Sequence, residues 1–382
     1  MSKLSQEVKD ELRQSRSAVE AEDPELTGEK AEKKKKIKKR VGIILFVLLN
    51  AAVLFFTAKD EFTKERPKLP GDPFSIASIL FLLGGILCLA VVLLSETFKY
   101  MLMMRHLGEK ISFRIAFETA ALGKYYDCIT PSGAGGQPFQ IYHLHTNGYS
   151  DGASSAMPLS GFFTMQFGFV FLAILVFIIN NNAIGDAIGI KITAYVGAFV
   201  YTLAPVMIII SAVAPKIAMK IVAFFVKLGA KMRLVKNPNH TIMKAVKALN
   251  NYSQSLKRIA KSKLLLFELL VLSVIFQAAI AMMPFFAVHT FGGHIEFFRS
   301  FSMCVFIYAA ITIVPTPGNS GAAEGSFYII FSQMDTSGVF WAMLLWRVLC
   351  YYSFIVIGVV IYGIKALRKI LSKKKVSQNE TV

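Results

Sequence analysis

Residues 311–331 read ITIVPTPGNSGAAEGSFYIIF and interrupt a long apolar region with two prolines, several glycines and a single acid. A matching break, ITPSGAGGQPFQIYHL, lies at residues 129–144 in the first half of the chain. Broken apolar segments in corresponding positions of two halves are a strong indication of the transport site of a membrane protein. The fold and function are therefore predicted from these two breaks and the charges around them.

The composition indicates an integral membrane protein. Of the 382 residues, 54% are hydrophobic and 17% are charged, whereas soluble domains have fewer apolar and more charged residues. The first 32 residues are polar and contain no signal-peptide-like apolar segment, so we expect the N-terminus to be retained. The cysteines lie in apolar segments without metal-binding spacing, which indicates buried thiols and neither a zinc site nor a disulfide framework.

Basic residues at the ends of apolar segments predict the topology. A polar tail, residues 1–40, ends in the basic cluster KKKKIKKR, and the segment 215–263 carries many bases but no acid. Because positive charge is retained on the cytosolic side, we expect both to be cytosolic, together with the connection 96–114 and the basic tail 370–382. The apolar residues of 215–263 recur at helical spacing, which predicts a helix along the membrane interface. A calmodulin-type or nucleic-acid role is the alternative for this segment.

The apolar runs between these flanks predict an all-α polytopic membrane protein whose transmembrane domain covers residues 41–369. Six runs are long enough to cross about 30 Å of hydrocarbon at about 1.5 Å per residue. The two broken segments, 115–151 and 299–333, are expected to form re-entrant helical hairpins. The charge rule is satisfied only if the first opens to the cytosol and the second to the outside, as in an inverted repeat. The predicted spans are 41–58, 74–95, 152–180, 192–214, 264–288 and 341–363.

The backbone at the two breaks must be buried in protein or line a wet cavity, because unsatisfied polar groups in hydrocarbon are costly. Helix N-termini that face such a gap present N–H groups and a positive dipole end to an anionic head group. The alternative is that both breaks are packing kinks without a ligand. The residues predicted to line the transport site are Lys124, Asp127, Thr130, Pro131, Gly133, Gly135, Gly136 and Gln137 at the first break, and Pro315, Thr316, Pro317, Gly318, Asn319, Gly321, Glu324 and Arg347 at the second.

Four of these residues are charged and need a partner or a function in an apolar region. Glu324 and Arg347 lie in apolar runs, where a charge costs roughly 2.5 to 3.5 kcal/mol unless it is paired or hydrated. We therefore expect them to form a structural ion pair, or to face a polar cavity in head-group or proton coupling. Lys124 is the expected phosphate contact of the first hairpin. For Lys124 and Asp127, anchoring at the membrane interface is the alternative.

Motifs for catalysis and metal binding are weak. His143 and His145 follow the first break at a spacing of two, which favours a strand over one helical face. No set of carboxylates or cysteines accompanies them, so no metal site is predicted. The sequence contains no Walker A loop, no GxSxG elbow and no HExxH motif, so we predict neither catalytic residues nor a cofactor.

At the motifs ITPSGAGGQPFQIYHL and VPTPGNSGAAEGSFYIIF the sequence resembles the flippase-like family named after the transmembrane region of lysylphosphatidylglycerol synthase, the MprF-type membrane domain. The resemblance extends over residues 40–369. It implies a bacterial protein that moves a lipid between leaflets, such as an anionic or aminoacylated phospholipid or an isoprenoid phosphate. Members that also synthesise the lipid carry a C-terminal aminoacyltransferase domain, for which we expect no room here. Many relatives have an acid and a base where this chain has Gln137 and Gln140, which argues against an ionic role there.

The leading hypothesis is a lipid flippase or scramblase-like transporter in the bacterial cytoplasmic membrane, with both termini in the cytosol. Its partners would be membrane lipids, with no nucleic acid, and a homo-oligomer is left open. The alternative to a transporter is an enzyme, a phosphatidylglycerol lysyltransferase. A third reading is a membrane scaffold that recruits a partner through residues 215–263.

Overall fold

A computed structural model gives the structure of the chain and describes residues 75–130, 133, 135–180, 188–231, 237–312, 314, 316–332 and 338–379. All regular elements in these ranges are helical, which confirms the all-α class. The predicted first span, the tail 1–40 and two site residues lie outside the described ranges; these residues are Pro131 and Pro315.

Five helical segments within the described ranges are long and apolar enough to cross a membrane. They correspond to five of the six predicted spans and confirm a polytopic membrane protein. The segments are α3 (Ile76–His106), α6 (Asp151–Ile179), α7 (Ile188–Val213), α10 (Lys263–Thr290) and a continuous run of α13 (Val339–Arg347), the π-helix η1 (Val348–Tyr352) and α14 (Ser353–Asn379). The last helix extends through most of the predicted tail 370–382.

The long helices pack closely because small residues lie where they cross. α10 contacts α3, α6 and α13 along its length. At Gly168 of α6 a Cβ atom would lie 2.9 Å from the carbonyl carbon of Ser273 in α10. Small residues at such crossings let helix backbones approach within the membrane, where van der Waals packing drives association.

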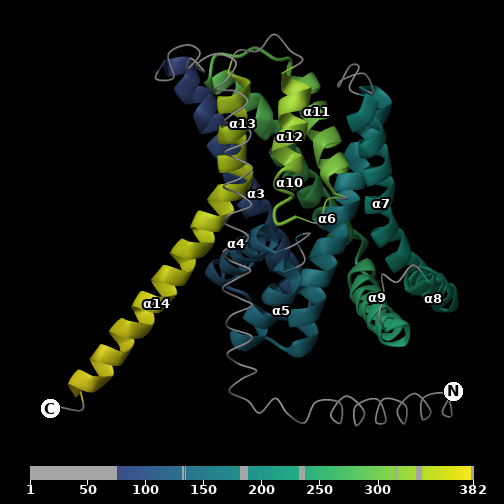
Figure 1. Cartoon of the computed structure of the whole chain (residues 1–382). Coiled ribbons are helices and arrows are strands. Elements are labelled where there is room, and N and C mark those ends of the chain that lie inside the picture. Colours follow the sequence, from purple (N-terminus) through teal and green to yellow (C-terminus); the bar gives the residue numbers. More distant parts are fainter. Residues whose placement is uncertain are drawn as a thin grey trace, which may run out of the picture. The chain divides into compact units, whose positions relative to one another are not determined.

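Both breaks form pairs of short helices, as predicted. The first pair is α4 (Phe113–Ile129) with α5 (Gly136–Thr146), and the second is α11 (Phe297–Ile311) with α12 (Ala322–Phe331). In Figure 1, α4 and α5 lie in the lower half of the bundle, whereas α11 and α12 lie in its upper half. This arrangement fits hairpins that enter from opposite ends, while the membrane side of each stays a prediction. The expectation of a strand at His143 and His145 is wrong, because both residues belong to α5.

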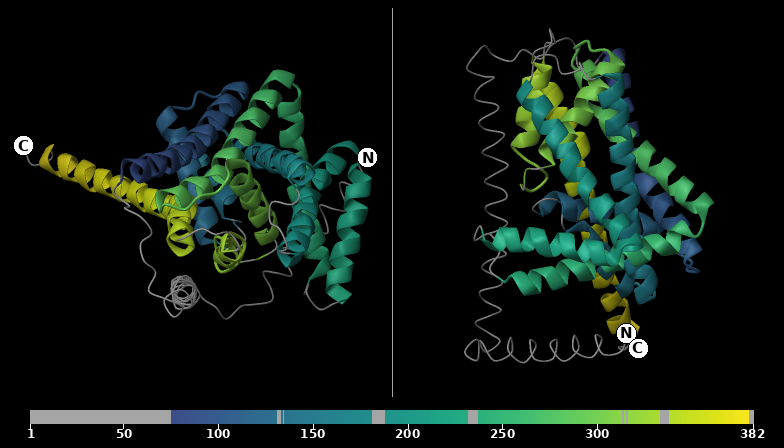
Figure 2. Two further views of the ribbon diagram at one scale, coloured as in Figure 1. Left: turned by 90° about the horizontal axis from the view of Figure 1, so that it is seen from above. Right: turned by 90° about the vertical axis from the view of Figure 1, so that its right-hand side faces the viewer.

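The basic segment 215–263 contains two amphipathic helices, α8 (Pro215–Lys231) and α9 (Pro238–Ala260). The prediction of helical structure is therefore confirmed. α8 and α9 contact each other, and α9 also contacts α6 and α7. In the right-hand view of Figure 2 they lie crosswise to the long helices, which is the orientation expected of helices at a membrane interface.

Candidate functional site

The first break brings the end of α4 against the beginning of α5. Asp127 Oδ1 accepts a hydrogen bond from the Gly136 N–H at 3.0 Å, and Thr130 Oγ1 accepts one from the Gly135 N–H at 2.9 Å. A Cβ atom on Gly136 would lie 2.2 Å from Asp127 Oδ1, so the carboxylate can cap α5 only because this residue is glycine. The N–H groups that were predicted to face a head group are thus bonded to the side chains of Asp127 in α4 and Thr130 directly after it. A head group would reach them by displacing these side chains.

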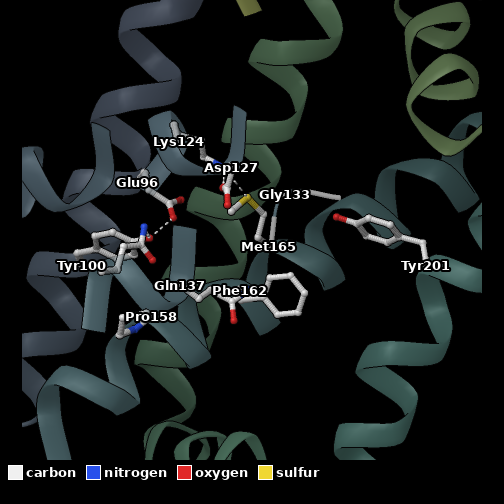
Figure 3. Close-up of a pocket in the computed structure, with 11 residues that line it drawn as sticks. Glu96, Tyr100, Lys124, Asp127, Gly133, Gln137, Pro158, Phe162, Met165 and Tyr201 are labelled. Atoms are coloured by element: carbon white, nitrogen blue, oxygen red, sulfur yellow. Dashed lines mark hydrogen bonds and ion pairs between the residues drawn. The ribbon is translucent and has the colours of Figure 1, made fainter. Parts of the chain in front are cut away.

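A cavity of about 200 Å³ lies beside Asp127, where α3, α4, α5, α6 and α7 meet. Figure 3 shows Glu96, Lys124 and Asp127 on one side and Tyr201 on the other, with its hydroxyl directed into the cavity. The wall therefore combines opposite charges with aromatic and apolar side chains. The residues that line it are Glu96, Tyr100, Lys124, Asp127, Gly133, Gln137, Gln140, Pro158, Phe162, Met165 and Tyr201.

A buried ion pair on α3 supports this cavity. Lys99 Nζ lies 2.8 Å from Glu96 Oε2, and both side chains are at most 2% exposed. The Tyr100 hydroxyl donates to Glu96 Oε1 at 2.5 Å and accepts from Gln140 Nε2 at 2.8 Å. This network joins α3 to α5 across the cavity. It also gives Gln140 a neutral hydrogen-bonding role, in keeping with the absence of charge at that position.

The sequence-based prediction missed Glu96 and Lys99. It ended the span at residue 95 and assigned 96–114 to a cytosolic connection, whereas α3 continues to His106. The spacing of Glu96, Lys99 and Tyr100 contained the signal, because residues three and four apart share one helical face and can neutralise each other. Because the two charges neutralise each other, α3 can keep them buried within the bundle.

Lys124 is the cation most loosely held at the cavity. Its Nζ lies 3.7 Å from Asp127 Oδ2, 3.9 Å from Met165 Sδ and 4.7 Å from the centroid of the Phe276 ring. A charge-assisted hydrogen bond between an ammonium and a carboxylate is shorter, about 2.7 to 2.9 Å. Lys124 and Asp127 retain 17% and 34% exposure. The ammonium can therefore accept a phosphate or carboxylate as a closer partner.

The second break is held by the pair that the sequence suggested. Arg347 Nε lies 2.7 Å from Glu324 Oε1, and both side chains are at most 4% exposed. Glu324 Oε2 also accepts the Gly321 N–H at 2.7 Å, which caps α12. Arg347 Nη2 donates to the Gly318 carbonyl at 3.2 Å and to Ser320 Oγ at 3.1 Å. The pair therefore bonds α13 to the turn that precedes α12.

The turn itself needs unusual backbone angles. Gly318, Asn319 and Gly321 have φ values of 58°, 54° and 90°. Glycine adopts such values without a steric penalty, and asparagine tolerates them better than most residues. Asn319 is the single non-glycine residue with positive φ in the described ranges. The sequence PGNSG is thus explained by the geometry of the turn.

Tyr351 of η1 connects the two breaks. Its hydroxyl donates to the Cys128 carbonyl at the end of α4, at 3.4 Å. Its ring centroid lies 4.3 Å from the guanidinium carbon of Arg347, and a Cβ atom on Gly318 would lie 2.0 Å from a ring carbon. A π-helical turn often marks a functional position inside a longer helix. Here it places one side chain against both broken segments.

The predicted site residues that the structure describes thus fall into three groups. The first group lines the cavity and consists of Lys124, Asp127, Gly133 and Gln137. Thr130, Gly135 and Gly136 form the turn beside it. The residues described at the second break are Thr316, Pro317, Gly318, Asn319, Gly321, Glu324 and Arg347, and none of them lines this cavity. One polar gap shared by both breaks was expected, and the described cavity belongs to the first break.

A third polar cluster joins α14 to the first hairpin. Lys365 Nζ lies 2.7 Å from Glu118 Oε2 and 2.8 Å from His143 Nε2. Because an ammonium group only donates, His143 Nε2 is the acceptor of this hydrogen bond. His143 Nδ1 then donates to Thr119 Oγ1 at 3.0 Å. Burial, aided by the charge of Lys365, lowers the pKa of His143 to about 4 against the opposing effect of Glu118. No cluster of three or more metal-binding side chains occurs in the described part of the chain.

These features define a polytopic helical membrane protein with two hairpins of broken helices and a charged cavity inside the bundle. The family described as the lysylphosphatidylglycerol synthase TM region matches residues 41–358. The chain therefore belongs to this family, as its two motifs predicted. A relative from Archaeoglobus fulgidus, named UPF0104 membrane protein, is 23% identical over 332 residues, which cover 84% of this chain and 94% of the relative.

Proposed function

We propose that the protein moves a lipid with a phosphate-containing head group between the leaflets of the membrane. The observation that carries this proposal is the charged cavity at the first break, which lies inside an otherwise apolar bundle. Charged residues inside a membrane-spanning bundle are costly and usually mark the path of a polar substrate. Membership of a family named after a lipid synthase's membrane region supports a lipid as that substrate.

The charges of the cavity suit a head group that carries both signs. Glu96 and Lys99 neutralise each other at 2.8 Å, so they contribute structure more than net charge. Lys124 and Asp127 are further apart, at 3.7 Å. A phosphate would bind Lys124, and the ammonium of an aminoacylated head group would bind Asp127. An isoprenoid phosphate or a plain anionic phospholipid would use Lys124 alone.

We place the protein in the bacterial cytoplasmic membrane with both termini in the cytosol. The basic cluster at 33–40, the acid-free segment 215–263 and the bases at 365–375 support this orientation. With that orientation, the first hairpin opens to the cytosol. A cysteine-accessibility scan in intact cells tests it, and labelling of both hairpins from the same side contradicts it.

Transport is tested by reconstitution. Proteoliposomes are compared with empty liposomes for the transfer of fluorescent phosphatidylglycerol, aminoacyl-phosphatidylglycerol and an isoprenoid phosphate between leaflets. Lys124→Gln should slow transfer at least tenfold, whereas Lys263→Gln, at an exposed lysine outside the cavity, should not. No acceleration over empty liposomes with any of these lipids removes the proposal.

The same preparation tests the enzymatic alternative. The purified protein is incubated with phosphatidylglycerol and lysyl-tRNA, and the lipids are separated. We expect no lysylated lipid, because the matched family is the TM region. Formation of lysylphosphatidylglycerol by this chain alone would replace transport by synthesis as its activity.

A further inference from the structure

A second hollow lies between α6 and α7, and some of its lining residues neighbour those of the charged cavity. Its volume is about 210 Å³. It is lined by α6 residues between Phe169 and Phe177 and by α7 residues between Tyr195 and Thr202, nearly all of them apolar. We refer to this hollow as the α6–α7 groove. It contains no charged side chain.

The groove continues the cavity along the same two helices. On α6, Met165 lines the cavity and Phe169, about one turn further, lines the groove. On α7, Tyr201 lines the cavity and Thr202 lines the groove. The ring centroids of Phe169, which lines the groove, and Tyr201, which lines the cavity, lie 4.6 Å apart. A charged compartment is thus followed at once by an apolar one, with an aromatic pair at the boundary.

We propose that the α6–α7 groove holds a hydrocarbon chain of the same lipid whose head group occupies the charged cavity. This inference rests on the proposed function for the identity of the lipid. The groove extends along about eight residues of α6, or roughly 12 Å, close to the thickness of one leaflet. Ile174 and Phe199 of its wall are 53% and 67% exposed, so a chain can enter the groove sideways from the bilayer.

The arrangement assigns separate tasks to the two hollows. Lys124 and Asp127 recognise the head group. Tyr201 lies where the head group and the hydrocarbon chain meet, because its hydroxyl is directed into the cavity (Figure 3) and its ring contacts Phe169. Aromatic side chains with one polar end suit such a boundary. A free phosphate or a soluble head-group fragment would fill only the cavity. The affinity of the protein for a lipid should therefore increase with the length of the lipid's hydrocarbon chain.

The test uses the full-length purified protein and a photoreactive lipid. Phosphatidylglycerol with a diazirine near the end of one acyl chain is bound, irradiated and mapped by mass spectrometry. We expect labelled residues within 169–177 and 195–202. Diacylglycerol with the same chain but no phosphate should label these segments at least fivefold less, because it lacks the anchor at Lys124.

Variants that fill the groove provide the control. Ala198→Trp should lower labelling of both segments at least fivefold, while Val200→Trp, on an exposed face of α7 outside the lining, should leave it unchanged. If Ala198→Trp does not fold, Thr202→Phe is the second variant. The inference is overturned if the two lipids label the groove equally, or if a folded groove variant is labelled like the wild type. Either result would mean that the lipid binds only nonspecifically to the surface.

The experiment separates this inference from the proposed function, because labelling reports binding and not transport. Specific labelling without transfer in proteoliposomes retains the bipartite site and removes the transport proposal. Transfer without labelling of the groove retains transport and removes the site.

Discussion

The ion pair of Glu324 and Arg347 offers the sharpest test of how the second break is stabilised. The sequence left open whether it is structural or takes part in coupling. Four variants separate these roles: Glu324→Gln, Arg347→Met, the double variant with methionine at both positions, and Glu296→Gln as an exposed control. Glu296 precedes α11 and its side chain forms no capping bond.

The expected magnitudes follow from burial and bonding. Removing one member of a buried pair leaves the other charge uncompensated, which costs about 3 to 5 kcal/mol. Glu324→Gln keeps an oxygen for the Gly321 N–H, so the cap, which contributes about 1 kcal/mol, survives and the cost lies at the lower end. Arg347→Met costs more, because the Gly318 carbonyl and Ser320 hydroxyl also lose their donor. The double variant leaves no buried charge at the second break, so it should recover the part of the larger loss that comes from the uncompensated carboxylate. The part that comes from the unpaired Gly318 carbonyl, Ser320 hydroxyl and Gly321 N–H should remain.

The assay is unfolding by sodium dodecyl sulfate in mixed micelles, together with transfer in proteoliposomes. A structural pair predicts two unstable single variants, a more stable double variant, and transfer that follows the fraction folded. A coupling role predicts a stable double variant without transfer. Unfolding of Glu324→Gln at the same detergent fraction as Glu296→Gln would refute the assignment of a buried, uncompensated charge.

Three further predictions concern the first hairpin and its contacts. Gly136→Ala should destabilise the protein by about 1 to 3 kcal/mol, because its Cβ would lie 2.2 Å from Asp127 Oδ1. Gly325→Ala is the control, since its Cβ would have no atom within 4 Å. Equal melting temperatures of these two variants would contradict the close approach. Tyr351→Phe should lower the free energy of unfolding by at least about 0.5 to 1.5 kcal/mol, because the hydroxyl that donates to the Cys128 carbonyl is lost; unfolding by sodium dodecyl sulfate measures it. His143 has a pKa of about 4 when folded and about 6.5 when unfolded, so its contribution to stability is complete above pH 6.5 and declines as the pH falls toward 4, by up to about 3 kcal/mol; a wild-type decline no steeper than that of His143→Gln would refute this.

Hydropathy and charge predicted the fold because they act over whole segments. The spans were found from runs of apolar residues, and the hairpins from prolines and glycines that a span cannot contain without compensation. Glu324 and Arg347 were also singled out correctly as residues that need a partner. In each case the free-energy cost of placing a charge or an unsatisfied backbone group in hydrocarbon is large, so one residue and its immediate neighbours suffice for the prediction.

The cavity as a whole was harder to predict because its lining combines residues of five helices that are far apart in the sequence. Lys99 Nζ donates to the Gly161 carbonyl of α6 at 3.3 Å in addition to pairing with Glu96. The contact with Gly161 joins residues 62 positions apart and leaves no signal in a local window. The pair with Glu96 does leave one in its spacing, but a hydropathy average counts both residues only as charges. Asp127 was predicted as a site residue, but its hydrogen bond to the Gly136 N–H, nine positions further along the chain, was not.

The two breaks differ in how tightly their charges are held, and this difference bears on which one binds a ligand. At the second break, Glu324 and Arg347 are buried and lie 2.7 Å apart. At the first, Lys124 and Asp127 lie 3.7 Å apart and remain partly exposed beside a cavity. A ligand can replace a long, solvated pair at far lower cost than a short, buried one. We therefore expect exchange of head groups at the first break. The second break, in contact with the end of α4 through Tyr351, would then hold that end in place.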